Sequence, residues 1–285
     1  MKSDNYEVNL TSWFYTGSFN NGSQGNVTAN YDFFIDWGDG SEMEHKENSQ
    51  ANSNNRIPTT HTFKKKGVYF VTIKGTCDNL YGYDGNVNAG NKVSHALVHS
   101  LWGIIVPKDS TSPLKYGWGS FFGCQNLKYV GYGVFHNITE CREVPHLYDG
   151  AILAKIEPWM LYGGYKLESI SYTFENCQML TIDADVFKNC TNITNAEHAF
   201  HRCNSLVEIP QGLFDPLTKL QTVEVCFKSC TNLSKVPVNL FDKCPNITNF
   251  KQCFCGGGYN GDASYVSTMK INTALPPMWL RNNVL

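Results

Sequence analysis

One large apolar residue recurs at every thirteenth or fourteenth position along the second half of the chain. The residues in this phase are Phe121, Phe135, Tyr148, Leu161, Phe174, Phe187, Phe200, Phe214, Phe227, Phe241 and Phe254. Six residues after most of them stands a second apolar residue, such as Leu167, Leu206 or Leu233. A fixed period of this kind indicates a repeat architecture, in which each unit buries its apolar side only against its neighbours.

Two half-units make the full repeat, whose length is roughly 26–27 residues. The segments CNSLVEIPQGLF and CTNLSKVPVNLF alternate with NCTNITNAEHAF and KCPNITNFKQCF. Such a coil has room for a short strand, a turn and a helical or irregular return. We expect Leu206 and Ile209, like Leu233 and Val236, to point into the core, with proline ending the strand.

Cysteine follows the same period. The chain has eleven cysteines, an odd number. Five of them lie three residues after a phenylalanine, namely Cys124, Cys177, Cys190, Cys203 and Cys230. Cys244 occupies the matching position in the alternate half-unit. Equivalent positions on successive coils predict a ladder of small buried thiols rather than a disulfide framework. No CxxC pair offers zinc spacing, so the sequence predicts no metal site.

The segments FENCQML, FKNCTNI, FHRCNSL and FKSCTNL share the pattern F-x-x-C-x-x-L, and IP-x-x-LF follows one of them. They resemble the BspA-like leucine-rich repeats, over residues 121–255. The pattern is weaker at residues 135–170, where Tyr148 and Leu161 replace phenylalanine. The resemblance implies a solenoid used for surface attachment or protein contact. Residues 256–285 leave the period and are interpreted as an insertion and a C-terminal cap.

The first part of the chain has a different pattern. Phe33, Ile35 and Trp37 alternate with Phe34 and Asp36, as in a strand with one face on a core. Glycines at 38 and 40 flank Asp39, which predicts a tight turn in which aspartate bonds its own backbone. A second strand is expected from Gly67 to Ile73, with its tyrosine and the tryptophan packing between two sheets.

The pieces WGDGS at 37–41, HTF at 61–63 and GVYFVTI at 67–73 resemble a PKD domain. The resemblance covers residues 1–76 and implies an immunoglobulin-like β sandwich. Its structural motif comprises Asp36, Trp37, Gly38, Asp39, Gly40, His61, Gly67 and Tyr69. The stretch from Ser41 to Thr60 departs from the family and is expected to be a variable loop. A calcium or catalytic role for Asp36 and Asp39 is the weaker interpretation, because the EF-hand spacing is absent.

Residues 77–120 join the two parts and are interpreted as a linker and N-terminal cap of the solenoid, with Trp102 and Trp118 covering its open end. The predicted fold class is therefore mainly β with short helices: an N-terminal β sandwich followed by a C-terminal leucine-rich-repeat solenoid.

Charge is nearly balanced, with 23 basic and 25 acidic residues, which gives no global field to attract nucleic acid or an anionic membrane. No apolar stretch is long enough to predict membrane insertion, and no secretory leader is visible at the start of the sequence. GGGYNG at 256–261 lacks the context of a nucleotide site, and GxSxG, HExxH and Walker A motifs are absent. We therefore expect no enzyme activity, no catalytic residues and no cofactor.

The favoured function is a non-catalytic, adhesin-like interaction protein that binds a protein or glycan on a host or particle surface. The predicted contacts are exposed residues of the repeat strands, namely Tyr129, Glu168, Glu208 and Lys235. One alternative is a phage virion structural protein, such as a capsid decoration, fibre or tail component and hence an assembly subunit. A second is a glycan-active enzyme accessory module. The expected location is a bacterial cell surface or the secreted fraction, with the phage virion as the alternative.

Overall fold

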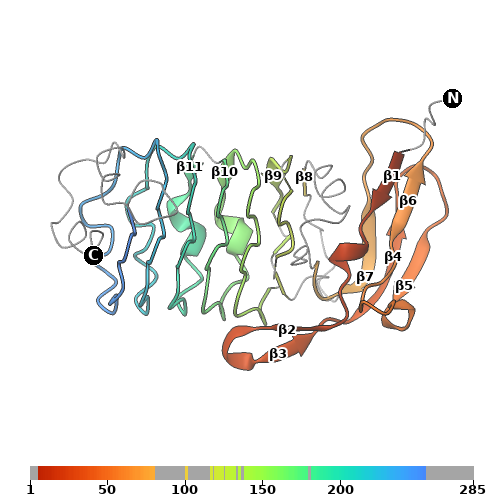
Figure 1. Cartoon of the computed structure of the whole chain (residues 1–285), viewed down its shortest axis with the longest axis horizontal. Coiled ribbons are helices and arrows are strands. Elements are labelled where there is room, and N and C mark those ends of the chain that lie inside the picture. The colour runs from red at the N-terminus through yellow and green to blue at the C-terminus, as the bar shows by residue number, and fades with distance from the viewer. Residues whose placement is uncertain are drawn as a thin grey trace.

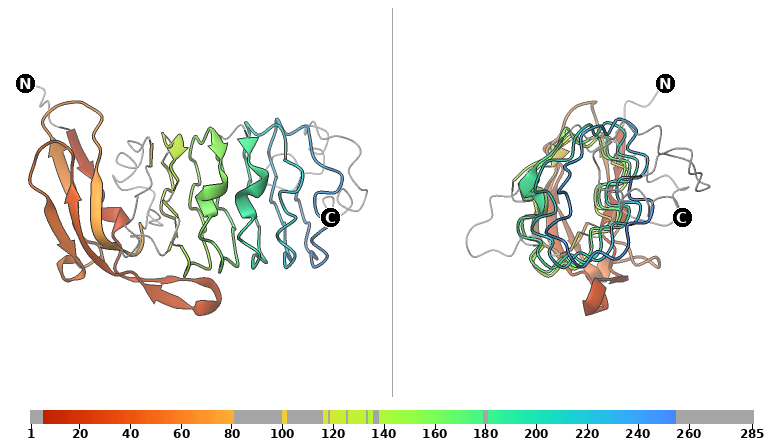
Figure 2. Two further views of the ribbon diagram at one scale, coloured as in Figure 1. Left: turned by 180° about the vertical axis from the view of Figure 1, so that it is seen from behind. Right: turned by 90° about the vertical axis from the view of Figure 1, so that its left-hand side faces the viewer.

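The computed structural model describes residues 6–80, 100–101, 116–117, 119–124, 126–132, 134–135, 138–178 and 181–254. These residues form mainly short strands, and every helix among them is a short 3-10 helix. Figure 1 shows a row of stacked coils with the N-terminal strands gathered at one end. The view along the stack in Figure 2 shows successive coils lying almost on top of one another. None of the helices in the described ranges has the length and hydropathy needed to cross a bilayer.

Three small antiparallel sheets lie in the N-terminal part, one of them a hairpin described below. One has β4 (Tyr31–Asp36) between β5 (Glu44–Glu47) and β7 (Thr72–Cys77). Another pairs β1 (Tyr6–Asn9) with β6 (Thr60–Phe63). The 3-10 helices in this part are η1 (Thr11–Trp13), η2 (Gly22–Gln24) and η3 (Asn48–Gln50). The predicted alternation fits β4, because Phe33 and Ile35 are buried while Phe34 is exposed.

The tryptophan that follows β4 contacts the second sheet. Trp37 is fully buried and its ring stacks on His61 of β6 at 4.7 Å between centroids. Its Nε1 donates to Oε1 of Glu44 at 2.7 Å. His61 Nε2 lies 2.8 Å from Oδ2 of Asp39, in the turn where Gly38 has a φ of 74°. The turn residues thus fix a ring stack that joins β4 to β6.

Two local expectations are wrong. The strand expected from Gly67 begins only at Thr72, and Val71 is exposed. The backbone before this strand instead lies against the turn after β4, where a Cβ added to Gly38 would be 2.6 Å from the Phe70 carbonyl oxygen. The stretch from Ser41 to Thr60 is not all loop, because β5 pairs with β4 there. Pairing with the exposed edge of β4 outweighs the polar composition of that stretch.

The coils are joined by two ladders of parallel pairs. One ladder consists of single bridges, Glu143 to Ser169 to Asn195 to Thr222 to Asn249. The other is made by short strands and a further bridge between Glu208 and Lys235. Its strands are β8 (Ser100–Leu101) paired with β9 (Tyr129–Val130), and β10 (Lys155–Ile156) paired with β11 (Thr181–Ile182). From Glu143 onwards, paired residues are one full repeat apart, as the sequence period predicts.

Backbone amides connect each coil to the next along the first ladder. The amides of Ile170, Tyr172, Phe174 and Asn176 donate to carbonyls of the following coil, at 2.8–3.0 Å. The amides between them bond back within their own coil, as Thr173 does to Ile170. Because the two kinds of donor alternate, the backbone amides bond both to the next coil and within the turns of their own coil, and no regular helix is needed.

Aromatic rings fill the core of the stack. Tyr148, Phe174, Phe200, Phe227 and Phe254 lie on successive coils, one full repeat apart. Neighbouring ring centroids are 5.1–5.5 Å apart with ring planes within 11° of parallel. Leu206, Ile209, Leu233 and Val236 are buried beside them, as predicted.

The cysteines form the predicted core thiols. All ten described cysteines are buried. Cys177 Sγ donates to the Tyr148 carbonyl at 3.0 Å, and Cys203 and Cys230 repeat this contact one coil further on, to Phe174 and Phe200. Cysteine suits the position because it is small and apolar, and still supplies a weak donor to a buried carbonyl.

Alkaline pH should destabilise this core. Burial raises the pKa of Cys190 to about 12, so the folded chain keeps a proton that the unfolded chain loses above pH 9. Stability from these thiols is therefore full below pH 9 and is lost progressively as the pH rises towards 12. We expect the free energy of unfolding, measured in urea, to fall over this range. At neutral pH, iodoacetamide should label Cys190 and Cys203 only after unfolding; rapid labelling in the native protein contradicts the prediction.

The two parts are held together by a hairpin, formed by β2 (Ser18–Asn20) and β3 (Asn26–Thr28), that extends under the coils (Figure 1). At its tip the buried Asn21 donates to the Glu140 carbonyl at 3.0 Å and accepts from the Arg142 amide at 2.7 Å. A ring contact at the base of the stack, between Trp13 and Phe121, adds to this interface.

Replacing Asn21 by alanine should loosen the interface. The Asn21→Ala change leaves a buried amide and a carbonyl without partners, so we expect a loss of about 1–3 kcal/mol in unfolding free energy. Urea denaturation followed by tryptophan fluorescence measures it. Asn26→Ala, at an exposed site on the same hairpin, should change stability by less than about 0.5 kcal/mol. Equal effects of the two changes would show that Asn21 does not hold the hairpin in place.

Candidate functional site

Three of the four predicted contact residues share one ladder. Tyr129 belongs to β9, and Glu208 and Lys235 form the last described bridge of the same ladder. Lys235 Nζ lies 3.1 Å from Oε2 of Glu208, and both side chains are more than half exposed. The structure therefore places these three residues along one row, with β10 and β11 on the coils between Tyr129 and Glu208.

Glu168 lies beside the other ladder and contacts the chain's own hairpin. Its carboxylate accepts from the Ser23 amide at 3.0 Å and from the Ser23 hydroxyl at 2.6 Å, and it pairs with Arg142. Burial alone would raise the pKa of the Glu168 carboxylate. The hydrogen bonds from Ser23 and Arg142 have the larger combined effect, so the pKa lies below its ordinary value. This carboxylate holds the hairpin on the coils and is not brought together with Tyr129, Glu208 and Lys235.

Exposed aromatic side chains gather where two successive coils leave the second ladder. We call Tyr132, Trp159, Tyr162 and Tyr165 the aromatic surface. Trp159 is presented by η4 (Pro158–Leu161), and η5 (Ala184–Phe187) occupies the matching place on the next coil. The Tyr132 ring centroid lies 6.4 Å from those of Trp159 and Tyr162. Tyr132 is 63% exposed and Tyr165 46%.

Trp159 anchors this surface to the strand that carries Tyr129. Its indole Nε1 donates to the Val130 carbonyl of β9 at 2.8 Å. Partial burial and the neighbouring phenol of Tyr162 raise the pKa of Tyr165. Tyrosine and tryptophan have rigid rings with polar tips, and they are among the residues that contribute most of the binding energy at recognition surfaces.

A second group of side chains follows the turns of the first ladder. We call His146, Asp149, Tyr172, Glu175, His198 and His201 the histidine row. The Tyr172 ring stacks between His146 and His198, at 4.9 and 4.5 Å. Asp149 Oδ2 lies 2.9 Å from His146 Nδ1, and Glu175 Oε1 lies 2.8 Å from His201 Nδ1.

Burial shifts the protonation of this row. Burial, together with the neighbouring His201, lowers the pKa of His198 to about 4, so its imidazole is neutral at neutral pH. Burial also raises the pKa of Asp149, although the hydrogen bond from His146 opposes the shift. The row is thus a partly desolvated group of imidazoles and carboxylates.

The prediction from sequence did not include the histidine row, although the repeat period contains a signal for it. Asp149, Glu175 and His201 are successive members of one repeat position, and Lys228 follows. His146, Tyr172 and His198 occupy a second such position three residues earlier. Titratable groups that recur at one repeat position must lie side by side on neighbouring coils, so alignment by the full period would have found them.

A polar cleft lies along the coils beside the first ladder. It has two adjoining hollows of about 510 and 550 Å³, which share Thr194 and Lys219. Lys219 Nζ donates to Asn192 Oδ1 at 2.7 Å within it. Arg142 and Glu168 line the hollow at the hairpin end, so the hairpin tip lies next to this cleft.

No family model matches this chain, and no curated protein matches it. The predicted cap residues Trp102 and Trp118, and the whole segment 256–285 with GGGYNG, lie outside the described residues.

Proposed function

We propose that the protein is a non-catalytic interaction protein that binds a protein or glycan through the aromatic surface and the adjoining row of Tyr129, Glu208 and Lys235. The observation that carries the proposal is the exposure of the aromatic surface. The phenylalanine column of the repeat is buried in the core, yet here rings from two neighbouring coils face solvent. Contiguous exposed apolar area of this kind marks an interaction site.

We further propose the architecture that the motifs suggest. Residues 1–76 form a PKD-like β sandwich and residues 121–255 a BspA-like leucine-rich-repeat solenoid. The ring stack of Trp37 on His61 supports the first assignment. Parallel pairing of residues one full repeat apart supports the second. Such a protein would act at a bacterial cell surface, with the sandwich as spacer and the solenoid as contact surface.

Binding should depend on the aromatic surface. A panel of immobilised glycans and purified cell-surface proteins, read by surface plasmon resonance, separates the two partner classes. The double change Tyr132→Ala and Tyr162→Ala should weaken binding at least about tenfold, because tyrosine is enriched among interface hot spots, whose truncation costs about 2 kcal/mol or more. Tyr6→Ala, at an exposed tyrosine of β1, is the control and should leave binding unchanged. The proposal fails if the wild-type chain binds neither panel or if the double variant binds equally well.

The order of charges on the row should also matter. Swapping the pair, with Glu208→Lys and Lys235→Glu together, keeps an ion pair between the coils and should leave the melting temperature unchanged, since an exposed pair contributes only about 0–1 kcal/mol. A partner that contacts Glu208 and Lys235 with complementary charges should lose affinity, because like charges then face each other across the interface. Affinity that survives the swap would remove Glu208 and Lys235 from the contact.

A further inference from the structure

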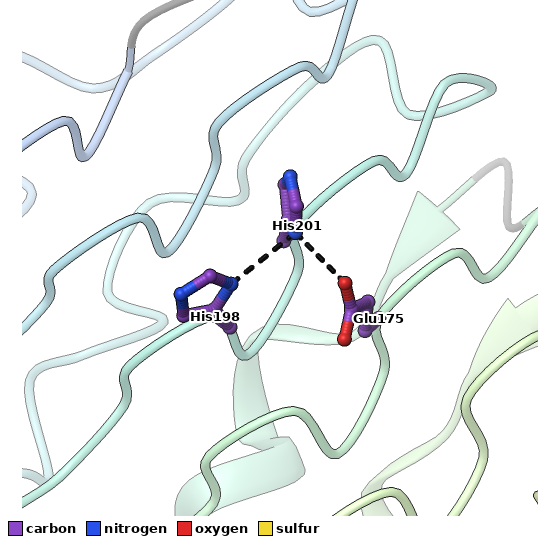
Figure 3. A group of neighbouring side chains, drawn as sticks. All are labelled: Glu175, His198 and His201. Atoms are coloured by element: carbon purple, nitrogen blue, oxygen red, sulfur yellow. Dashed lines mark hydrogen bonds and ion pairs between the residues drawn. The ribbon is translucent and has the colours of Figure 1, made fainter. Parts of the chain in front are cut away.

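Three side chains with metal-binding atoms converge in the histidine row. His198 Nδ1 lies 3.2 Å from His201 Nδ1, which lies 2.8 Å from Oε1 of Glu175. The three residues each offer a ligand atom, and these atoms all fall within 4.8 Å of one another. Figure 3 shows His201 between the other two side chains, with its Nδ1 directed at both.

The hydrogen atoms of these three side chains cannot give all three ligand atoms a good hydrogen-bond partner at once. A neutral imidazole nitrogen either carries one proton or offers one lone pair. If His201 Nδ1 is protonated, its single hydrogen must serve both Glu175 and His198. If it is not, it can accept from His198, but its lone pair then faces the Glu175 carboxylate. A cation placed among the three atoms removes this conflict, because every lone pair then has a positive partner.

The backbone holds the three residues in place. His198 donates its amide to the Glu224 carbonyl of the next coil at 3.0 Å, and Asn176 beside Glu175 donates to the His201 carbonyl at 2.8 Å. The His198 ring is further fixed by its stack on Tyr172. Ligand atoms held by packing and by inter-coil bonds lose little freedom when an ion binds.

His198 also occupies a backbone position that favours glycine. Its φ is 54°, and Gly119 takes the equivalent place on an earlier coil with a φ of 60°. A non-glycine residue in this region costs about 1–2 kcal/mol. His146, Tyr172 and Val225 take the same place on other coils with φ of 56–58°, so this turn recurs along the stack.

We propose that Glu175, His198 and His201 bind one divalent transition-metal ion of the Zn²⁺ type. Two imidazoles and a carboxylate are a ligand set that Zn²⁺ takes, and its bonds of about 2.0–2.2 Å place ligand atoms about 3.3 Å apart in a tetrahedron. The separations of 3.2 and 2.8 Å around His201 Nδ1 need only small shifts, and the ligand atoms of His198 and Glu175 lie within 4.8 Å of each other. Each of the three side chains keeps some exposure, so a fourth ligand can come from solvent.

The charged surroundings favour a cation. Asp149 and His146 form a second cluster that shares Glu175, and Glu197 Oε1 lies 3.8 Å from His198 Nε2. The Glu224 carboxylate and Lys228 also act on His198, and Glu224 is paired with Lys251 at 3.4 Å. The four carboxylates of Asp149, Glu175, Glu197 and Glu224 therefore outnumber these two lysines around the proposed ion. This site is separate from the aromatic surface and stands whether or not the proposed function does.

Cobalt substitution tests the site directly. The full chain, freed of metal with a chelator, is titrated with Co²⁺ and then with Zn²⁺. We expect visible d–d bands of a four-coordinate nitrogen and oxygen site, saturation at one ion per chain, and loss of the bands as Zn²⁺ displaces Co²⁺. A near-ultraviolet thiolate band would show that a cysteine binds the ion and would overturn the assignment.

Variants identify the ligands. Glu175→Gln keeps the side-chain shape, and His198→Asn places a residue that tolerates positive φ; each should lower Zn²⁺ affinity at least tenfold in calorimetry. His45→Gln, at a histidine of β5 paired with Asp32, is the matched control and should bind like wild type. Circular dichroism establishes that each variant is folded, and one folded ligand variant suffices for the test. Absence of binding by the wild type, or unchanged affinity in Glu175→Gln or His198→Asn, overturns the proposal.

Discussion

Hydrogen bonds from alternate backbone amides of one coil to the next are the constraint on which this structure depends. From Ile170 to Asn176, each second amide donates to a carbonyl of the following coil, and the amides between close turns within their own coil. This pattern requires the coils to have nearly equal length, because a shift of one residue would place a donating amide opposite a carbonyl that closes a turn in its own coil. The strict repeat spacing is therefore a requirement of the backbone as well as of the core.

The same register determines what lies inside and outside the stack. It brings Phe174, Phe200 and Phe227 into one column of parallel rings, and it directs core thiols such as that of Cys203 at the carbonyl of a ring residue. On the outside it aligns side chains of equivalent position into rows. The histidine row and the row that ends at Lys235 both arise in this way, so a surface substitution on one coil acquires neighbours from the coils beside it.

The hairpin makes the N-terminal part continuous with the coils. Asn21 accepts from the amide of Arg142, and Ser23 engages Glu168. Gly22 at the tip has a φ of 58°, and a Cβ there would lie 2.9 Å from Oε2 of Glu168. A small residue with a left-handed backbone is thus needed where the hairpin meets the coils. These contacts place the N-terminal sheets at one end of the stack and the hairpin tip beside the polar cleft.

The sequence by itself determined the repeat period, the column of core residues, the buried thiols and the alternation of Phe33 and Ile35, because each follows from spacing along the chain. It also pointed to Tyr129, Glu208 and Lys235 as exposed positions of the repeat strands. Only the tertiary structure decided that Glu168 binds Ser23 and that β5 forms within the polar stretch after Ser41. It also decided how the side chains of Glu175, His198 and His201, which the repeat period places on neighbouring coils, are directed at one another. These features depend on contacts between residues far apart in the sequence. The physical reason is that hydrogen bonds and charges act over a few ångströms in space, whereas a sequence pattern gives only the spacing of residues along the chain.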